Sequence, residues 1–244
     1  MSTTLIRRDL ALSDPDLVAQ GLRRLARWLG TDTNNVRPAE FSQRRAELLD
    51  LEPRLLELSR SQDDMVRELA TDALGAFLGD AAVARLVELA EDSCERVRAS
   101  AVGALEYWPD HPKARVLLLA SSAGGHWTVR MRATRALGGF SGADVIEVLM
   151  EGLLDPDSYV RFAAADSLRR QPAETFLPRL RQYADYPAPH LLDAAIDLLG
   201  DAGTREDEKF LSHVGGLFNL SQPKFIRSWA RKAAKRIRIR LAKA

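Results

Sequence analysis

The chain of 244 residues has little cysteine and few aromatic residues: a single cysteine, Cys94, and 7% Phe, Trp and Tyr. One cysteine cannot form an internal disulfide, which excludes a secreted fold held together by disulfides. No apolar run approaches the roughly 20 residues that a membrane-spanning helix requires. The first 16 residues lack the apolar core of a signal peptide. We therefore expect a cytoplasmic protein without a membrane span.

The composition that remains favours helices. The sequence is rich in Ala, Leu and Arg, and 46% of its residues are hydrophobic while 28% are charged. Ala, Leu and Arg are strong helix formers, whereas the β-branched and aromatic residues that favour strands are fewer. The hydrophobic fraction is ordinary for a globular protein and is sufficient for a sizeable core. The composition therefore predicts a folded, all-helical protein.

The net charge of +1 hides an asymmetry along the chain. Residues 222–244 contain nine basic residues and no acidic one, so the remaining 221 residues carry a net charge of −8. A strongly basic segment attached to an acidic body is a feature that the net charge alone does not reveal.

A short pattern recurs along the chain: an aliphatic residue, usually Val followed by Arg, with small residues four to eight positions later. Successive copies lie 30 to 35 residues apart, which indicates internal structural repeats. The seven copies start at Val36-Arg37, Val66-Arg67, Val97-Arg98, Val129-Arg130, Val160-Arg161, Leu191-Leu192 and Ile226-Arg227.

Each repeat is predicted to be a pair of antiparallel helices. In the best copies the aliphatic mark, the Ala four residues later and the Leu eight residues later share one helical face. A second amphipathic run precedes each copy, and one pair must stack on the next to bury its apolar face. The sequence therefore predicts an all-α fold, a right-handed α-solenoid of about seven helix pairs. The expected pairs are 15–29 with 36–50, 52–61 with 63–78, 81–91 with 94–107, 112–122 with 126–139, 143–154 with 157–170, 173–184 with 188–200, and 204–218 with 222–242.

This pattern resembles the HEAT repeat family, in particular the short repeats named after phycobilin lyases, over residues 36 to 240. The resemblance rests on residues that are best kept at Asp63, Val66, Arg67, Ala70, Ala73, Leu74 and Gly75. We expect a single solenoid domain, 1–244, with an atypical N-terminal cap (1–50) and a basic capping helix (222–244). The repeated arginines are expected to hydrogen-bond to acidic groups or helix ends in the neighbouring repeat. These are Arg67, Arg98, Arg130 and Arg161.

In the family that this chain resembles, the second helix of each pair lines the concave side of the solenoid. The positions that flank the Val-Arg marks would then form a binding groove, and in the central repeats they are aromatic and arginine residues, as in binding hot spots. The candidate partner-binding residues are Tyr107, Trp127, Met131, Arg132, Arg135, Tyr159, Phe162 and Asp166. The alternative is that the aromatic side chains pack between adjacent helices, because a register shift of one residue would bury them.

The C-terminal segment combines an apolar stripe with a basic surface. The stripe residues, beside Trp229, are Ile226, Ala230, Ala233, Ile237 and Leu241. The basic patch comprises Lys224, Arg227, Arg231, Lys232, Lys235 and Arg238. The patch is suited to nucleic acid, an anionic lipid surface or an acidic protein. The alternative is a capping helix with a polar outer face, whose cations pair with internal carboxylates such as Asp201, Glu206, Asp207 and Glu208.

The sequence carries no recognisable catalytic or metal-binding motif. None of the four histidines lies at metal-ligand spacing from another His, Cys or carboxylate, so we expect no metal and no cofactor. We therefore expect a non-catalytic scaffold or adaptor that holds a protein partner in the groove. The alternative is a nucleic-acid-binding HEAT-like protein, at the extreme a DNA glycosylase-like alkylation-repair protein. The Trp-x-x-x-Asp spacing of that branch is missing here, because Met131 is the fourth residue after Trp127.

Overall fold

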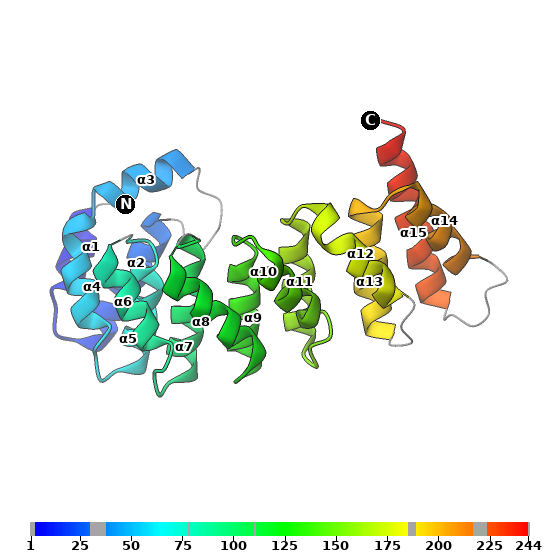
Figure 1. Cartoon of the computed structure of the whole chain (residues 1–244). Helices are drawn as coiled ribbons and strands as arrows, with labels where there is room; N and C mark the ends of the chain where they lie inside the picture. The colour runs from blue at the N-terminus through cyan, green and yellow to red at the C-terminus, as the bar shows by residue number, and fades with distance from the viewer. Residues whose placement is uncertain are drawn as a thin grey trace. The chain divides into compact units, whose positions relative to one another are not determined.

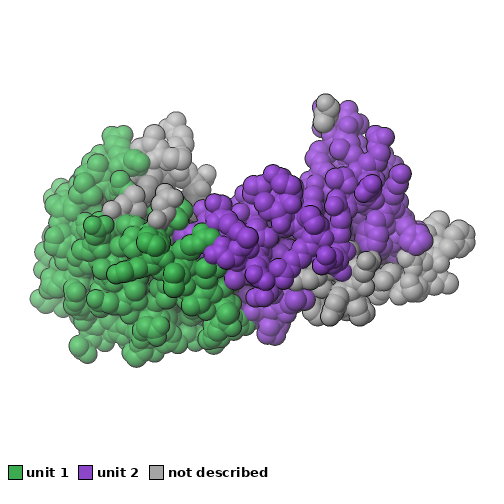
Figure 2. Space-filling view, in the orientation of Figure 1, with its two compact units in different colours: residues 1–136 green, residues 137–244 purple. Residues whose placement is uncertain are grey.

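The computed structural model describes residues 3–29, 38–77, 79–109, 111–184, 189–216 and 224–243. These residues form 15 α-helices and two short 3-10 helices, and no β-strand (Figure 1), which confirms the predicted all-α fold. The chain divides into two compact units, unit 1 (1–136) and unit 2 (137–244) (Figure 2). The single domain expected over 1–244 stays a prediction. No helix within the described ranges is long and apolar enough to cross a membrane.

Unit 1 is built from two layers of helices. The second helices of successive pairs, α2, α5 and α7, pack side by side in one layer, and the first helices α4, α6 and α8 pack in the other. The helix α9 follows α8 and ends at the boundary between the units. The elements are α1 (Thr3–Leu10), α2 (Pro15–Leu29), α3 (Pro38–Ala46), η1 (Leu49–Leu51), α4 (Glu52–Leu58), α5 (Asp64–Leu74), α6 (Asp80–Leu89), α7 (Glu95–Ala104), η2 (Leu105–Tyr107), α8 (Pro112–Ala123) and α9 (Trp127–Leu137).

The first helix pair differs from the prediction. The helix α1 packs against α2, and α2 packs against α5 in the layer of second helices. Although α2 also contacts α3, it is therefore a second helix and not the first helix of the predicted pair of 15–29 with 36–50. The helix α2 contains no Val-Arg mark, and α3 is inserted before the first described mark, so the repeat pattern did not reveal the role of α2. The mark Val36-Arg37 lies outside the described residues. Described helices lie at the ranges expected for the six later pairs, and contacts within the pair are observed for five of them.

Unit 2 repeats the same arrangement. The second helices α11, α13 and α15 pack side by side, and the first helices α10 and α12 pack against each other. The helix α15 also packs along α14, so the C-terminal pair closes this end of the layer. The elements are α10 (Ala143–Gly152), α11 (Ser158–Arg169), α12 (Ala173–Ala184), α13 (Pro189–Ala202), α14 (Arg205–Val214) and α15 (Lys224–Leu241).

The core is formed by the helical face that the repeat pattern predicts. In α11 the mark Val160 and the residues four and eight positions later, Ala164 and Leu168, have no exposed surface. The residues at the same spacing are also buried in the copies that begin at Val66, Val97 and Val129. Small residues also bring second helices close together, since a Cβ on Gly75 of α5 would lie 2.7 Å from the Cβ of Ala104 in α7.

The repeated arginines mainly bind the turn of their own repeat. Each one donates from Nη1 to a backbone carbonyl five or six residues earlier, in the turn that follows the first helix. The acceptors are the carbonyls of Ser61 for Arg67 (2.8 Å), Asp92 for Arg98 (2.7 Å), Gly125 for Arg130 (2.6 Å) and Asp155 for Arg161 (2.7 Å). A guanidinium there satisfies backbone carbonyls that lie outside the hydrogen bonds of the helix. The expected bond to the neighbouring repeat is observed for Arg67, whose Nη2 lies 3.0 Å from Asp92 Oδ1.

A buried carboxylate connects two repeats in unit 2. Asp207 in the first turn of α14 is 4% exposed and accepts hydrogen bonds from Arg181 Nε of α12 at 2.8 Å and from the backbone N–H of Thr204 at 2.7 Å. Burial alone would raise the pKa of the Asp207 carboxyl, but the bonds from Arg181 and Thr204 outweigh it and hold the pKa below its ordinary value of 3.8. The carboxylate form therefore stabilises this junction.

Candidate functional site

Acidic residues fix the start of two second helices and with it the direction of their side chains. Asp63 Oδ1 accepts a hydrogen bond from the backbone N–H of Val66 at 2.9 Å, and Asp157 Oδ1 accepts one from Tyr159 at 2.8 Å. Both are N-caps, which satisfy backbone donors that the first helical turn leaves open. Because Asp157 sets the first residue of α11, it also sets which side chains of α11 face the core.

Two aromatic side chains of α11 project away from the core. Tyr159 is 64% exposed and Phe162 is 68% exposed, while Val160 between them is fully buried. The register inferred from the sequence is therefore right for these residues, and packing between adjacent helices does not account for them. Exposed aromatic side chains on the second-helix layer are the kind of surface that partner proteins cover.

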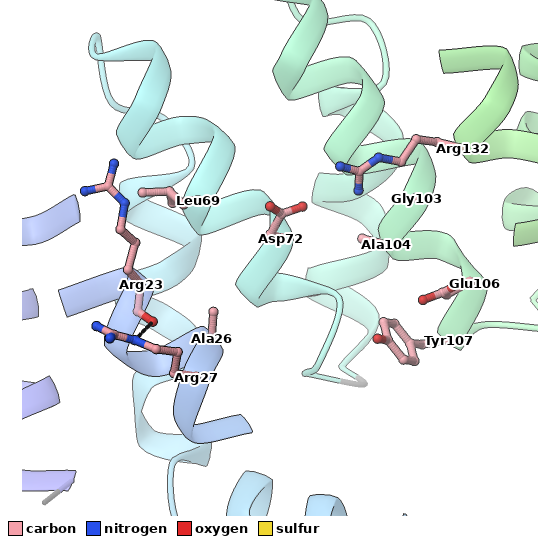
Figure 3. A pocket seen from close by; sticks show the side chains of 10 residues that line it. All are labelled: Arg23, Ala26, Arg27, Leu69, Asp72, Gly103, Ala104, Glu106, Tyr107 and Arg132. Atoms are coloured by element: carbon pink, nitrogen blue, oxygen red, sulfur yellow. Dashed lines mark hydrogen bonds between the residues drawn. The ribbon is translucent and has the colours of Figure 1, made fainter. Parts of the chain in front are cut away.

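The second helices of unit 1 form a hollow of about 590 Å³, which we call the first hollow (Figure 3). Asp72 of α5 lies in the middle, with Arg23 and Arg27 of α2 on one side and Arg132 of α9 and Tyr107 of η2 on the other. Gly103 makes room for this arrangement, because a Cβ there would lie 2.9 Å from Cδ of Arg132. The first hollow thus combines three arginines with a central carboxyl group.

Burial shifts the ionisation of two groups in the first hollow. Burial raises the pKa of the Asp72 carboxyl, although the charge of Arg132 and a hydrogen bond with the Ser100 side chain oppose that change. Burial, followed by the charge and hydrogen bond of Glu106, raises the pKa of Tyr107 to about 12. A cationic or hydrogen-bonding partner would therefore stabilise the charged form of Asp72, which burial disfavours.

A second hollow, of about 640 Å³, lies on the second helices of unit 2. Phe162 of α11 and Trp229 of α15 line it, and Trp229 is 43% exposed. Lys232 of α15 lines it as well. Ala194 and Ile196 of α13 also line it, as do three arginines and Asp197. This second hollow therefore combines apolar side chains with more cationic than anionic ones.

Two arginines and two aspartates bridge the three helices around the second hollow. Arg236 of α15 contacts Asp197 at 2.7 Å and Asp201 at 3.1 Å, both on α13. Arg169 of α11 pairs with the same two aspartates, and its Nε lies 3.0 Å from Asp201 Oδ2. The cluster is balanced in charge, and it holds α11 and α15 against α13.

The predicted groove residues are divided between the two units, and three of them line a hollow. Tyr107 and Arg132 line the first hollow, and Phe162 lines the second. Trp127 and Met131 of α9 are half-buried, and Arg135 of α9 is exposed. Asp166 of α11 forms an ion pair with Arg170 at 2.7 Å. The role of these residues in partner binding stays a prediction.

The basic residues of α15 differ in their surroundings. Lys232 faces the second hollow, whereas Arg231, Lys235 and Arg238 line a depression beside α14. Arg238 pairs with Glu208 at 2.8 Å, Arg231 donates to the carbonyl of Gly215 at 2.7 Å, and Arg227 is half-buried. Lys224, Lys232 and Lys235 are exposed, and within the described part of the chain they form no ion pair. Internal carboxylates thus occupy part of the cationic set, as the capping alternative expected.

The apolar stripe of α15 also ends earlier than predicted. Ile226, Ala230, Ala233 and Ile237 are buried, and Ala234 joins them. Leu241, which the sequence pattern placed in the stripe, is 37% exposed. It lies at the end of α15, one turn beyond the last buried position, Ile237.

Sequence reasoning missed several residues that line the two hollows. Arg23 and Arg27 were not considered because α2 was taken for a first helix. Arg169 and Arg236 were not considered because their aspartate partners lie 28 to 39 residues away along the chain. Within the described ranges, no group of three or more His, Cys, Asp and Glu side chains is placed to hold a metal ion.

The comparisons with known proteins agree with this architecture. The family model of HEAT repeats matches residues 51–125 and 114–187, which together exceed half of the chain. The complex of CpcE and CpcF of phycocyanin lyase from Nostoc sp. PCC7120 is similar in structure, with a TM-score of 0.54, 19% identity, and coverage of 100% of this chain and 93% of that one.

Two designed armadillo repeat proteins are also similar. One is in complex with the peptide (KR)4 and has a TM-score of 0.56 and 18% identity; the other has a TM-score of 0.54 and 17% identity. Each comparison covers 82% of this chain and 98% of the designed chain. At these identities the similarity shows the fold alone. A comparison with curated protein sequences found no match.

Proposed function

We propose that this chain, which belongs to the HEAT repeat family, is a non-catalytic scaffold or adaptor that holds a protein partner on its second-helix layer. The observation that carries the proposal is the exposure of Tyr159 and Phe162 on either side of the buried Val160. Each aromatic side chain that a partner covers contributes a large apolar area, and aromatic residues dominate binding hot spots. The first hollow, with Tyr107 and Arg132, is a second part of the proposed binding surface.

The packing of the second helices supports the same function. The N-cap of Asp157 and the bond from Arg161 to the Asp155 carbonyl hold the start of α11, and Arg169 fixes its end to α13. Side chains on a rigid helix lose less entropy on binding than side chains on a loop, which favours affinity. The similar designed protein holds a peptide, and CpcE and CpcF form a complex with each other. The lone Cys94 suits a reducing compartment, so we place the partner in the cytoplasm.

Site-directed crosslinking tests this proposal. A photo-reactive phenylalanine analogue at position 162 should crosslink to a partner in cells, with the product identified by mass spectrometry. The matched control carries the analogue at Val116 of the first helix α8, which is 66% exposed. We expect a discrete product at 162 and none at 116. Equal products at both positions, or none at either, would overturn the assignment of the second-helix layer as the binding surface.

A second candidate function is binding of nucleic acid or another polyanion through α15. The observation that favours it is that Lys224, Lys232 and Lys235 are exposed and form no ion pair among the described residues. A variant with Gln at all three positions should then lose affinity for duplex DNA in a mobility-shift assay, most strongly at low salt. If the wild-type chain shifts no DNA at low salt, this candidate is refuted.

A further inference from the structure

We infer that the second hollow binds an acidic peptide segment that inserts at least one large apolar side chain. This inference rests on the proposed scaffold function and specifies the partner for one of its two hollows. It combines three observations: apolar side chains that are open to solvent, a positive charge that the carboxylates of the described residues leave unbalanced, and helices that are held in place around the hollow.

The walls of the second hollow suit a large apolar side chain. Phe162 on α11 is 68% exposed and Trp229 on α15 is 43% exposed, and Ala194 and Ile196 of α13 line the same hollow. Trp229 is held by an edge-to-face contact with Phe225, with ring centroids 5.6 Å apart. The volume of about 640 Å³ lies within the range of pockets that bind ligands through apolar contacts. An aromatic or leucine side chain of a partner can therefore be buried in this hollow against Phe162 or Trp229.

The charge of the second hollow favours a negatively charged partner. Arg169 and Arg236 are balanced by Asp197 and Asp201 of α13. Two more cations line the hollow, Lys232 and Arg161. Arg161 donates to backbone carbonyls, and neither cation has a carboxylate partner among the described residues. A segment with two or more carboxylates would neutralise this excess, whereas a basic segment such as the (KR)4 peptide held by the designed armadillo protein would be repelled.

The same geometry favours a peptide over a nucleic acid. The unbalanced charge is confined to two side chains, whereas a nucleic-acid strand requires a row of cations that follows its phosphates. Asp197 lines the second hollow itself and Asp201 lies one turn further along α13, so a continuous phosphate backbone would pass close to both carboxylates. An acidic peptide can place its carboxylates next to Lys232 and Arg161 and its apolar side chain against the aromatic lining of the hollow.

Selection from a library of random displayed peptides tests the inference with the full chain. We expect the enriched peptides to share an excess of Asp and Glu around a large apolar residue. In fluorescence anisotropy, the best peptide should lose about tenfold in affinity with Phe162→Ala, as is typical of a hot-spot residue. Lys232→Glu should also weaken binding. The loss should be larger at low salt than at high salt, because the substitution reverses a positive charge at the hollow.

Matched variants separate the second hollow from the rest of the molecule. Val116→Ala removes an apolar side chain of similar exposure on the first helix α8 that lines neither hollow, and Lys235→Glu reverses a charge of α15 that faces α14. Both should leave the peptide affinity unchanged. Circular dichroism should confirm that all four variants retain the helical fold, since the four side chains are exposed.

Each outcome decides for or against the inference. Enriched peptides that are basic or neutral, or acidic peptides whose affinity Phe162→Ala and Lys232→Glu do not change, would overturn it. If such peptides instead require Tyr159 or the first hollow, the scaffold function stands and only the assignment of the second hollow fails. If no peptide is enriched while a single-stranded oligonucleotide binds and Lys232→Glu abolishes that binding, both the peptide inference and the scaffold function fail.

Discussion

The arginine of the repeat mark makes a testable contribution to stability, which differs between two otherwise similar positions. Arg67 and Arg98 both donate to carbonyls of the preceding turn, at 2.8 Å and 2.7 Å. Only Arg67 also pairs with the carboxylate of Asp92, through Nε at 3.1 Å and Nη2 at 3.0 Å. Substituting each arginine with Met keeps most of the side-chain volume and removes these bonds, so the two variants differ mainly in the ion pair.

The geometry gives an order of magnitude for both variants. Hydrogen bonds from a charged group stabilise by roughly 1.5–3 kcal/mol, so losing the turn bonds in Arg98→Met should cost about 2 kcal/mol. The Arg67 and Asp92 side chains are 11% and 12% exposed, which makes their ion pair largely buried. Breaking such a pair by removing one partner costs up to about 3–5 kcal/mol, so Arg67→Met should cost about 4 kcal/mol in total.

Urea denaturation followed by circular dichroism measures these losses, and amide hydrogen exchange in α5 and α7 shows whether unfolding is local, as repeat proteins allow. Burial raises the pKa of Asp92, but the bonds from Arg67 and the Cys94 N–H outweigh it and lower the pKa below 3.8. The stabilisation is therefore present above that pH and lost as the pH falls further. Arg67→Met should reduce this pH dependence. Equal destabilisation by both arginine variants, with unchanged pH dependence, would refute the reasoning.

Three further predictions concern packing and charge within each of the two units. Gly75→Ala should destabilise unit 1 by roughly 1–3 kcal/mol in urea denaturation, because its Cβ would meet the Cβ of Ala104, while Gly124→Ala, with open space around it, should have little effect. Ile237→Ala should lower the melting temperature, with a cost of about 2–4 kcal/mol, because Ile237 is fully buried in α15. Asp207→Asn should destabilise unit 2 at neutral pH and lessen the loss of stability below pH 3.8, measured by thermal melts across pH. If the variant lost stability below pH 3.8 as steeply as the wild type, the role assigned to Asp207 would be contradicted.

The repeat pattern was sufficient for most of the architecture because helix pairing in a solenoid is encoded locally. Val160, Ala164 and Leu168 are spaced for one helical face, and this face is buried in the structure. The same periodicity places Tyr159 and Phe162 on the opposite side, where both are exposed. The helices of the six later pairs and the exposure of these two aromatics could therefore be predicted from the sequence alone.

The tertiary structure decided the features that depend on partners distant in sequence. The helix α2 became a second helix because it packs on α5, across an insertion that contains α3. Arg236 shares the aspartates of α13 with Arg169, and Arg238 pairs with Glu208. Some of the nine cations of residues 222–244 are therefore paired within the chain and are not free to bind a partner. Helical periodicity states which residues share a face over about two turns, but it carries no information on which face of another repeat comes to lie against it. The local pattern therefore determined the helices and their core faces, and only the stacking of the repeats determined the two hollows and the charge that remains in them.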